Sequence, residues 1–408
     1  MKIDPKTFTR DYNLHVCIQC GTCTGGCPVK FRSPLNMRRL VRQTYFAPDP
    51  SLFRRPEWWA CTTCSTCTLR CPAGVKNVEL ILGVRNYLAN QGEVPSTIRD
   101  ALENTLLHGN PWGRFRDRRI DWAKDLEIKI IGEETAENLL FIGCAPSYDP
   151  RVQSLSIALF KIFQKAGLDF GILGKKESCC GNEIRRMGEQ ALFRKLSMDN
   201  TNLIKKTRVK RIITISPHCY NAFKNEYPDL DLPVHHYTQV LIELIEAGRI
   251  KLTGRSETLL TYQDPCFLGK QNGIFEEPRK ILRSIPGVTL IEMERSRERS
   301  LCCEGGGGRM WTEGFTEGTR NAEIRVREAL HLKAKILATS CPFCLLTLED
   351  AVKTSGLADQ MVVKDIGELV GEAIDSNSNN PIPCPPAGRL QIIINDPMTL
   401  FKTNYLVD

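Results

Sequence analysis

The sequence contains no stretch of the roughly 18 consecutive apolar residues that a transmembrane helix requires. Residues 1–16 are polar and charged and lack the apolar core of a secretory signal peptide. We therefore expect a cytoplasmic protein that contacts a membrane peripherally, through a partner subunit.

Aromatic residues are also scarce, at 7% of the 408 residues, and they do not alternate with basic side chains. The net charge is +8, with basic clusters at residues 114–119, 205–211 and 295–299. Surfaces that bind single-stranded nucleic acid combine basic grooves with aromatic stacking platforms. We therefore expect no nucleic-acid partner and interpret the clusters as solvated faces, which leaves an acidic docking partner open.

Cysteine, by contrast, is abundant, with 18 residues, many of them in closely spaced pairs. A protein without an export signal keeps its thiols reduced. Tight cysteine pairs in such a protein indicate metal ligands rather than disulfides.

Two runs near the N-terminus share the spacing C-x2-C-x2-C-x3-C-P, which is that of bacterial two-cluster ferredoxins. In this pattern three cysteines bind one cubane [4Fe–4S] cluster and the fourth binds the other cluster. We assign the first cluster to Cys17, Cys20, Cys23 and Cys71. We assign the second cluster to Cys61, Cys64, Cys67 and Cys27. Structural zinc is the alternative, but zinc favours two C-x2-C pairs over such runs.

The segment between the two runs is much longer than in two-cluster ferredoxins. Residues 35–45 and 78–88 are predicted helices, so we expect a mostly helical ferredoxin-like head over residues 1–100. Residues 101–137 are interpreted as a connecting region that wraps the next domain.

The remainder of the chain contains one cysteine pattern twice. Cys144 recurs as Cys266, the pair Cys179-Cys180 recurs as Cys302-Cys303, and Cys219 recurs as Cys344. Three landmarks at nearly constant offsets indicate an internal repeat.

Short apolar runs precede these cysteines and suit buried parallel strands. They cover residues 139–142, 212–215, 259–262 and 336–339. Helical patterns such as residues 155–166 separate them, so the predicted fold class is α/β, with two tandem α/β units and mainly parallel sheets. We place the units at residues 138–250 and 251–375, followed by a C-terminal extension at 376–408.

Ligands of parallel sheets bind beyond the carboxyl ends of the strands. Cys144, Cys219, Cys266 and Cys344 all follow predicted strand ends. Buried core cysteines are the alternative, but adjacent cysteines rarely both enter one core. The glycines at residues 305–308 are not a phosphate loop, because no Gly-Lys-Ser/Thr follows them. We expect their backbone N–H groups to approach a cluster.

The pattern Cys…Cys-Cys-Gly…Cys-Pro-x-Cys resembles the cysteine-rich CCG domains of heterodisulfide reductase. The segment Cys20-Gly21-Thr22-Cys23-Thr24-Gly25-Gly26-Cys27-Pro28 is similar to the ferredoxin-like subunit of that enzyme. A head followed by two CCG domains resembles the fused catalytic subunit of membrane-linked heterodisulfide reductases. The same layout occurs in the K subunit of the sulfite-reduction-associated membrane complex. Iron–sulfur subunits of anaerobic glycerol-3-phosphate and lactate dehydrogenases share it.

This resemblance, over about residues 10–375, implies that a repeat with five cysteines holds a noncubane [4Fe–4S] cluster at which disulfide chemistry occurs. The second repeat matches at all five positions, which are Cys266, Cys302, Cys303, Cys341 and Cys344. The first repeat has four of the five, Cys144, Cys179, Cys180 and Cys219. Ser216 replaces the fifth cysteine, so the first site is a candidate for a different cluster or for none.

Three further residues depart from the resemblance or lie outside it. Glu304 replaces the usual glycine after the cysteine pair and, if ionised, should lower the potential of the nearby cluster. His218 has three interpretations: replacement ligand, proton donor, or a histidine bonded to backbone. Cys384 is interpreted as a free thiol in the C-terminal extension.

These observations predict a heterodisulfide-reductase-like oxidoreductase acting on a sulfur group. Its expected cofactors are two cubane clusters and one noncubane cluster, with iron bound through the cysteines named above. Its expected partners are a membrane b-type cytochrome or a flavoprotein, and a small disulfide or a sulfur-carrier protein. The alternative is a non-catalytic relay subunit of a flavin-dependent dehydrogenase that feeds the quinone pool, and a zinc-bound scaffold is a third class.

Overall fold

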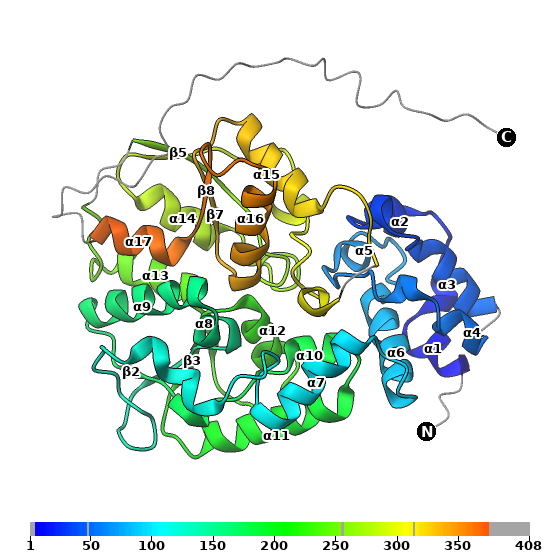
Figure 1. Cartoon of the computed structure of the whole chain (residues 1–408), viewed down its shortest axis with the longest axis horizontal. Helices are drawn as coiled ribbons and strands as arrows, with labels where there is room; N and C mark the ends of the chain where they lie inside the picture. Colours follow the sequence, from blue (N-terminus) through cyan, green and yellow to red (C-terminus); the bar gives the residue numbers. More distant parts are fainter. Residues whose placement is uncertain (1–4, 47–48, 254–256, 313–314, 375–408) are drawn as a thin grey trace.

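The computed structural model describes residues 5–46, 49–253, 257–312 and 315–374. A group of helices forms one end of the molecule, and two α/β units form the other (Figure 1). The predicted α/β fold class with a mostly helical head is confirmed. Within the described part of the chain, no helix has the length and apolar character needed to cross a membrane. Cys384 lies outside the described residues.

The head contains helices and 3-10 turns, and its described residues form no strand. Its elements are α1 (Pro5–Asp11), η1 (Leu14–Val16), α2 (Thr22–Gly25), η2 (Lys30–Arg32), α3 (Met37–Phe46), α4 (Pro50–Phe53), η3 (Pro56–Trp58), α5 (Thr66–Leu69), α6 (Asn77–Asn90) and α7 (Ser96–His108). Helices α3 and α6 confirm the two helices predicted there. The short helices α2 and α5 each sit inside a cysteine run and turn it back on itself.

The segment after α7 contains η4 (Arg116–Ala123), which packs against the first α/β unit. That unit contains β1 (Asn138–Phe141), α8 (Cys144–Tyr148), α9 (Pro150–Lys165), β2 (Phe170–Gly171), η5 (Gly174–Lys176), α10 (Asn182–Arg186), α11 (Gln190–Lys205), β3 (Arg211–Thr214), α12 (Pro217–Asn225), β4 (Val234–His236) and α13 (Tyr237–Glu246). Its sheet has the order β2-β1-β3-β4, and every pairing is parallel.

The second unit repeats this architecture. It contains β5 (Thr258–Tyr262), α14 (Glu276–Ser284), β6 (Val288–Leu290), η6 (Arg297–Arg299), η7 (Arg309–Trp311), α15 (Asn321–His331), β7 (Ile336–Thr339), α16 (Pro342–Thr354), β8 (Val362–Asp365) and α17 (Ile366–Ile374). Its sheet is parallel and has the order β6-β5-β7-β8. This order matches β2-β1-β3-β4 of the first sheet, strand for strand. The internal repeat in the sequence therefore corresponds to a repeat in topology.

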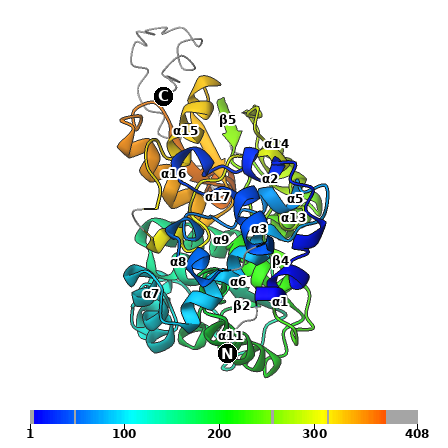
Figure 2. The same cartoon turned by 90° about the vertical axis from the view of Figure 1, so that its right-hand side faces the viewer.

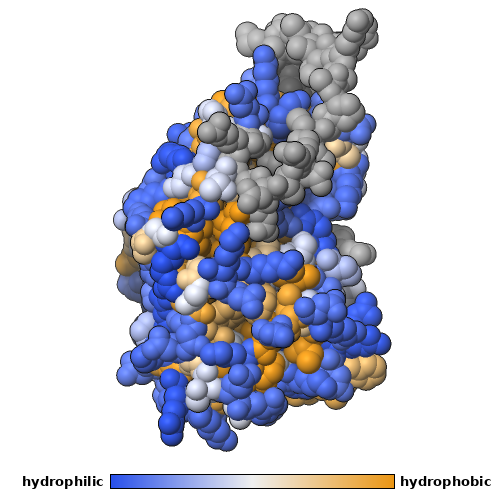
Figure 3. Space-filling model, turned by 90° about the vertical axis from the view of Figure 1, so that its left-hand side faces the viewer, coloured by the Kyte–Doolittle hydropathy of each residue, from blue (hydrophilic) through white to orange (hydrophobic). Residues whose placement is uncertain are grey.

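The strands are short and apolar because both faces of each sheet are covered by helices. All residues of β1 and β7 are buried, for example. At the end of the molecule away from the head, hydrophilic side chains surround a narrow band of apolar ones (Figure 3).

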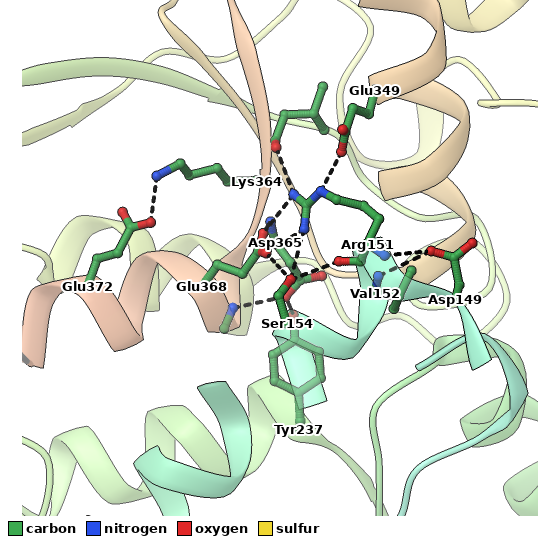
Figure 4. Close-up of polar contacts among 12 residues, drawn as sticks. Asp149, Arg151, Val152, Ser154, Tyr237, Glu349, Lys364, Asp365, Glu368 and Glu372 are labelled. Atoms are coloured by element: carbon green, nitrogen blue, oxygen red, sulfur yellow. Dashed lines mark hydrogen bonds and ion pairs between the residues drawn. The ribbon is translucent and has the colours of Figure 1, made fainter. Parts of the chain in front are cut away.

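The two units meet along α9 and α17, where Arg151 lies between two acidic side chains (Figure 4). Its guanidinium donates to Glu349 of α16 and Glu368 of α17, each at 2.5 Å. Nearby, the Tyr237 hydroxyl of α13 donates to the Asp365 carboxyl at 2.5 Å. These bonds link the two units through named polar groups as well as through packing.

Candidate functional site

The first cysteine group of the head surrounds a hollow at the surface. Cys17, Cys20, Cys23 and Cys71 all line it. The backbone N–H of Val75 donates to Cys71 Sγ at 3.3 Å, and Gln19 Nε2 donates to Cys17 Sγ at 3.2 Å. N–H donors aimed at cysteine sulfur are one means by which proteins tune iron–sulfur clusters, so these residues fit a thiolate-bound cluster.

The second group, Cys27, Cys61, Cys64 and Cys67, also comes together, but in a more enclosed place. Burial raises the pKa of Cys27, and the negative charges of Cys61 and Cys64 raise it further. Burial also raises the pKa of Cys61 to about 11, although the Arg85 guanidinium opposes this shift. Thiols that disfavour each other's ionisation in this way lie close together, which is the arrangement a shared metal cluster requires.

The five cysteines of the second repeat form one connected group. Cys303 and Cys344 have their Sγ atoms 3.2 Å apart, and the neighbouring Cys302 raises the pKa of Cys266 and lowers that of Cys303. Burial opposes ionisation of Cys341, but hydrogen bonds from Cys344 and His218 outweigh it and lower the pKa of Cys341 to about 5. The group follows β5 and β7 and lies at their carboxyl ends, where ligands of parallel sheets bind.

In the first repeat the four thiols of Cys144, Cys179, Cys180 and Cys219 also lie close enough to shift one another's pKa values. Ser216, at the fifth position, does something else: its Oγ accepts the backbone N–H of His218 at 3.2 Å and caps helix α12. Cys341 occupies the corresponding place before α16 and makes no such capping bond. The missing thiol of the first repeat is thus replaced by a helix cap.

Arg119 is a functional candidate that sequence analysis missed. Its guanidinium nitrogens lie 3.7 and 3.8 Å from Cys144 Sγ, and it forms a buried ion pair with Glu177 at 2.7 Å. Glu177 in turn accepts the backbone N–H groups of Ile142 and Gly143 at the end of β1. The first site therefore contains a fixed positive charge, which would stabilise a thiolate at Cys144.

His218 belongs to the first repeat in sequence but contacts the second site. Its Nδ1 lies 2.8 Å from Glu183 Oε1, its ring packs on Phe267 and Phe343, and Cys341 is close enough to shift its pKa. Burial lowers its pKa, but Cys341 and Glu183 outweigh burial and raise it to about 9. The structure thus directs His218 away from the first repeat's cysteines, contrary to the replacement-ligand interpretation, and gives it side-chain rather than backbone partners.

The head and the second repeat meet at their cysteine loops. The Cys302 thiol lies 3.4 Å from the Thr62 hydroxyl and, together with burial, raises the pKa of Cys64. The glycine run allows this close approach, since a Cβ on Gly307 would lie 2.7 Å from the carbonyl carbon of Thr62. The N–H groups of that run were expected to point toward a cluster, but the Gly308 N–H donates to the Glu183 carboxylate at 2.7 Å. Instead, the N–H of Glu304 donates to Cys302 Sγ at 3.4 Å.

Two buried cations at this junction have no carboxylate partner within the described residues. Arg85 donates only to backbone carbonyls, and Lys270 Nζ donates to Thr66 Oγ1 at 2.9 Å and to the Ser300 carbonyl at 2.6 Å. Buried charges are normally paired or bound to a counter-ion. Thiolate-ligated clusters held by Cys61, Cys64 and Cys302 would supply that negative charge, so the residues present fit such groups.

Glu304 is neutralised by an arginine from the head. Arg32 forms a nearly buried ion pair with it, and also donates to the carbonyls of Glu317 and Gly318. Glu304 adopts a φ of 68°, in the left-handed region where Gly181 of the first repeat has a φ of 78°. The ion pair accounts for a charged residue at a position that favours glycine, and it weakens the expected effect of the carboxylate on the potential.

Within the described residues, no three His, Cys, Asp or Glu side chains, the cysteine groups included, are arranged around a single metal ion. Comparison with family models assigns residues 13–75 to the 4Fe-4S dicluster domain. Residues 139–224 and 260–349 match the cysteine-rich domain called CCG.

Three relatives illustrate the similarity of the full chain. It is 34% identical to a probable iron-sulfur-binding oxidoreductase, FadF, of Bacillus subtilis, over 91% of this chain and 61% of that one. It is 34% identical to an EtfAB:quinone oxidoreductase of Syntrophomonas wolfei, over 78% of this chain and 46% of that one. It is 32% identical to one subunit of the dihydromethanophenazine:CoB--CoM heterodisulfide reductase of Methanosarcina barkeri, over 91% of this chain and 97% of that one.

The chain therefore combines a 4Fe-4S dicluster domain with two cysteine-rich CCG domains. It belongs to the family that contains this heterodisulfide reductase subunit of Methanosarcina. The chain spans 61% or less of the FadF and EtfAB:quinone oxidoreductase relatives, which are longer proteins.

Proposed function

We propose that this chain passes electrons from its head to the five-cysteine site of the second repeat, where a disulfide is reduced or formed. The contact between the Cys302 thiol and the Thr62 hydroxyl, at 3.4 Å, carries this proposal, because Thr62 lies beside Cys61 in the head and Cys302 belongs to the second repeat. The order of transfer is then Cys17, Cys20, Cys23 and Cys71 first, Cys27, Cys61, Cys64 and Cys67 second, and Cys266, Cys302, Cys303, Cys341 and Cys344 last.

Two cubane clusters and one noncubane cluster at these cysteines would supply one-electron steps and iron able to bind sulfur. The chain's own residues hold the thiolates, donate N–H groups to their sulfurs and exclude water from the junction. Lys270 and Arg85 place positive charge between the head and the second repeat. Reduction of one disulfide consumes two electrons and two protons and releases two thiols.

A relay without substrate chemistry is the second candidate, and one observation favours it. Four of the five second-repeat cysteines are 5% exposed or less, so a disulfide needs a route to them. The similarity to an EtfAB:quinone oxidoreductase supports a role in electron flow toward quinone. In either role we propose partner subunits, a flavoprotein or a membrane b-type cytochrome, and peripheral association with the membrane through them.

Matched cysteine variants of the two repeats test the proposal. We expect Cys302→Ala to abolish reduction of a small disulfide by reduced methyl viologen and Cys179→Ala to retain it. Iron content is measured on the same samples, so that loss of the head clusters is not mistaken for loss of the site. Equal activity of both variants, or an inactive wild-type protein with full iron content, would overturn the disulfide proposal.

A further inference from the structure

The surface of the head around Cys20 carries exposed apolar side chains beside an exposed cysteine. Cys20 is exposed, and Ile18 beside it is 68% exposed and lines the same hollow. Leu69, at the end of α5, is 53% exposed. Helices α2, α3 and α5, which carry this surface, lie together on the side of the molecule turned to the viewer in Figure 2.

Basic side chains surround these apolar ones, and acidic side chains are absent from both sequence segments that build the surface. Residues 12–46 and 61–78 contain no Asp or Glu. Arg38 lines the hollow, Arg42 follows one turn later on α3, and Arg70 follows Leu69; all three are exposed. We call Ile18, Cys20, Arg42, Leu69 and Arg70 the basic face.

The basic face is also the place where the first cysteine group meets solvent. The second head group is enclosed against the second repeat, where the Cys302 thiol lies 3.4 Å from the Thr62 hydroxyl. An external donor therefore comes nearest to the cysteines of the head at the Cys20 side. A redox centre at the middle of an apolar and basic surface is suited to a charged protein partner, because complementary charge speeds encounter and orients the complex.

We infer that the basic face docks an acidic electron-donor protein. This inference rests on the proposed function, since it assumes that electrons enter at the first head site. An anionic membrane would also attract apolar and basic side chains, but a membrane surface offers no electron donor to the exposed Cys20. The partner is therefore identified by its chemistry, as a small redox protein with a negatively charged surface around its own cofactor.

Salt-dependent reduction kinetics test the inference. The full chain with its clusters is mixed with a reduced acidic flavodoxin, and separately with reduced methyl viologen, which needs no docking surface. We expect the flavodoxin rate to fall at least tenfold between low and high salt, because steered encounter is screened. The paired variant Arg42→Glu/Arg70→Glu should lower the ratio of the flavodoxin rate to the viologen rate by tenfold or more at low salt.

Lys161→Glu provides the matched control, because Lys161 is exposed on α9, at the far end of the molecule from the head (Figure 1). Its ratio of rates should equal that of the wild type. The inference is overturned if the ratio is unchanged in the paired variant, if Lys161→Glu lowers it equally, or if vesicles of anionic phosphatidylglycerol retain the protein while salt leaves the flavodoxin rate unaltered. If any of these results is obtained while viologen still reduces the protein normally, the docking inference fails but the proposed electron path is not contradicted. Failure of the inference and failure of the proposed function can therefore be distinguished.

Discussion

Ser216 and Cys341 occupy the same position of the two repeats, each directly before a proline that begins a helix. The Ser216 hydroxyl is used by the backbone of α12, whereas the Cys341 thiol lies among four other thiols. One atom, oxygen or sulfur, therefore separates a helix cap from a candidate cluster ligand.

We expect Ser216→Ala to lower the free energy of unfolding by about 1 kcal/mol, the usual effect of losing an N-cap. Its iron content should equal that of the wild type, since the hydroxyl already has a backbone partner. Cys341→Ala should instead lose iron. Anaerobic denaturation and an iron assay on both variants give the answer, and a loss of iron from Ser216→Ala equal to that from Cys341→Ala would contradict the assignment.

At the scale of elements, α13 and the β8–α17 corner meet through Tyr237 and Asp365. Burial raises the pKa of Asp365, and the negative charge of Glu368 adds to this, while the Tyr237 hydroxyl and the Gly367 N–H oppose it. The folded state therefore holds a proton on Asp365 that the unfolded chain releases near its ordinary pKa of about 4.

This contact should make stability fall as pH rises. Below about pH 4 both states hold the proton, and above it the unfolded state loses the proton first, at a cost of up to about 1.4 kcal/mol per pH unit for one group. Asp365→Asn should flatten the decline between pH 5 and pH 8, and the exposed Asp350→Asn should not. Urea denaturation at several pH values across this range measures the free energy of unfolding. Identical slopes of that free energy against pH in the wild type and Asp365→Asn would refute the assignment.

The sequence predicted the elements well because their causes are local. Apolar runs located β1, β3, β5 and β7. The cysteine spacing predicted two groups in the head and one in each repeat. Contacts between residues far apart in the sequence were missed. The residues that flank Arg119, His218 or Lys270 in the sequence do not show which cysteine each of these side chains approaches in the fold. The glycine run was recognised as a site of close backbone approach, yet the backbone that it approaches belongs to the head.

At the scale of the whole molecule, Arg85 joins all three parts. Its guanidinium donates to the carbonyls of Trp58 and Cys61 in the head, Arg186 in the first repeat and Gly307 in the second. The side chain is fully buried. These parts are thus held around one cation that lies beside the junction of the cysteine loops.

We expect Arg85→Met to destabilise the protein by about 3 kcal/mol or more, because several buried carbonyls lose their donors. Arg85→Lys should have a smaller effect, since it keeps the charge with fewer donors. Arg54→Met, which removes an exposed ion pair with Glu93, should have a far smaller effect, because solvent screens exposed ion pairs. Chemical denaturation of the three variants ranks them, and an Arg85→Met protein as stable as Arg54→Met would show that Arg85 does not join the parts.

The central claim is that electrons pass from the head to the five-cysteine site and leave there to a disulfide. The most direct measurement is electron paramagnetic resonance of the head clusters after the fully reduced protein is mixed with 2-hydroxyethyl disulfide and frozen at increasing times. We predict that the disulfide reoxidises the head clusters of the wild type and leaves those of Cys302→Ala reduced. Head clusters that are reoxidised equally in both proteins, or by a quinone analogue but never by the disulfide, would contradict this account.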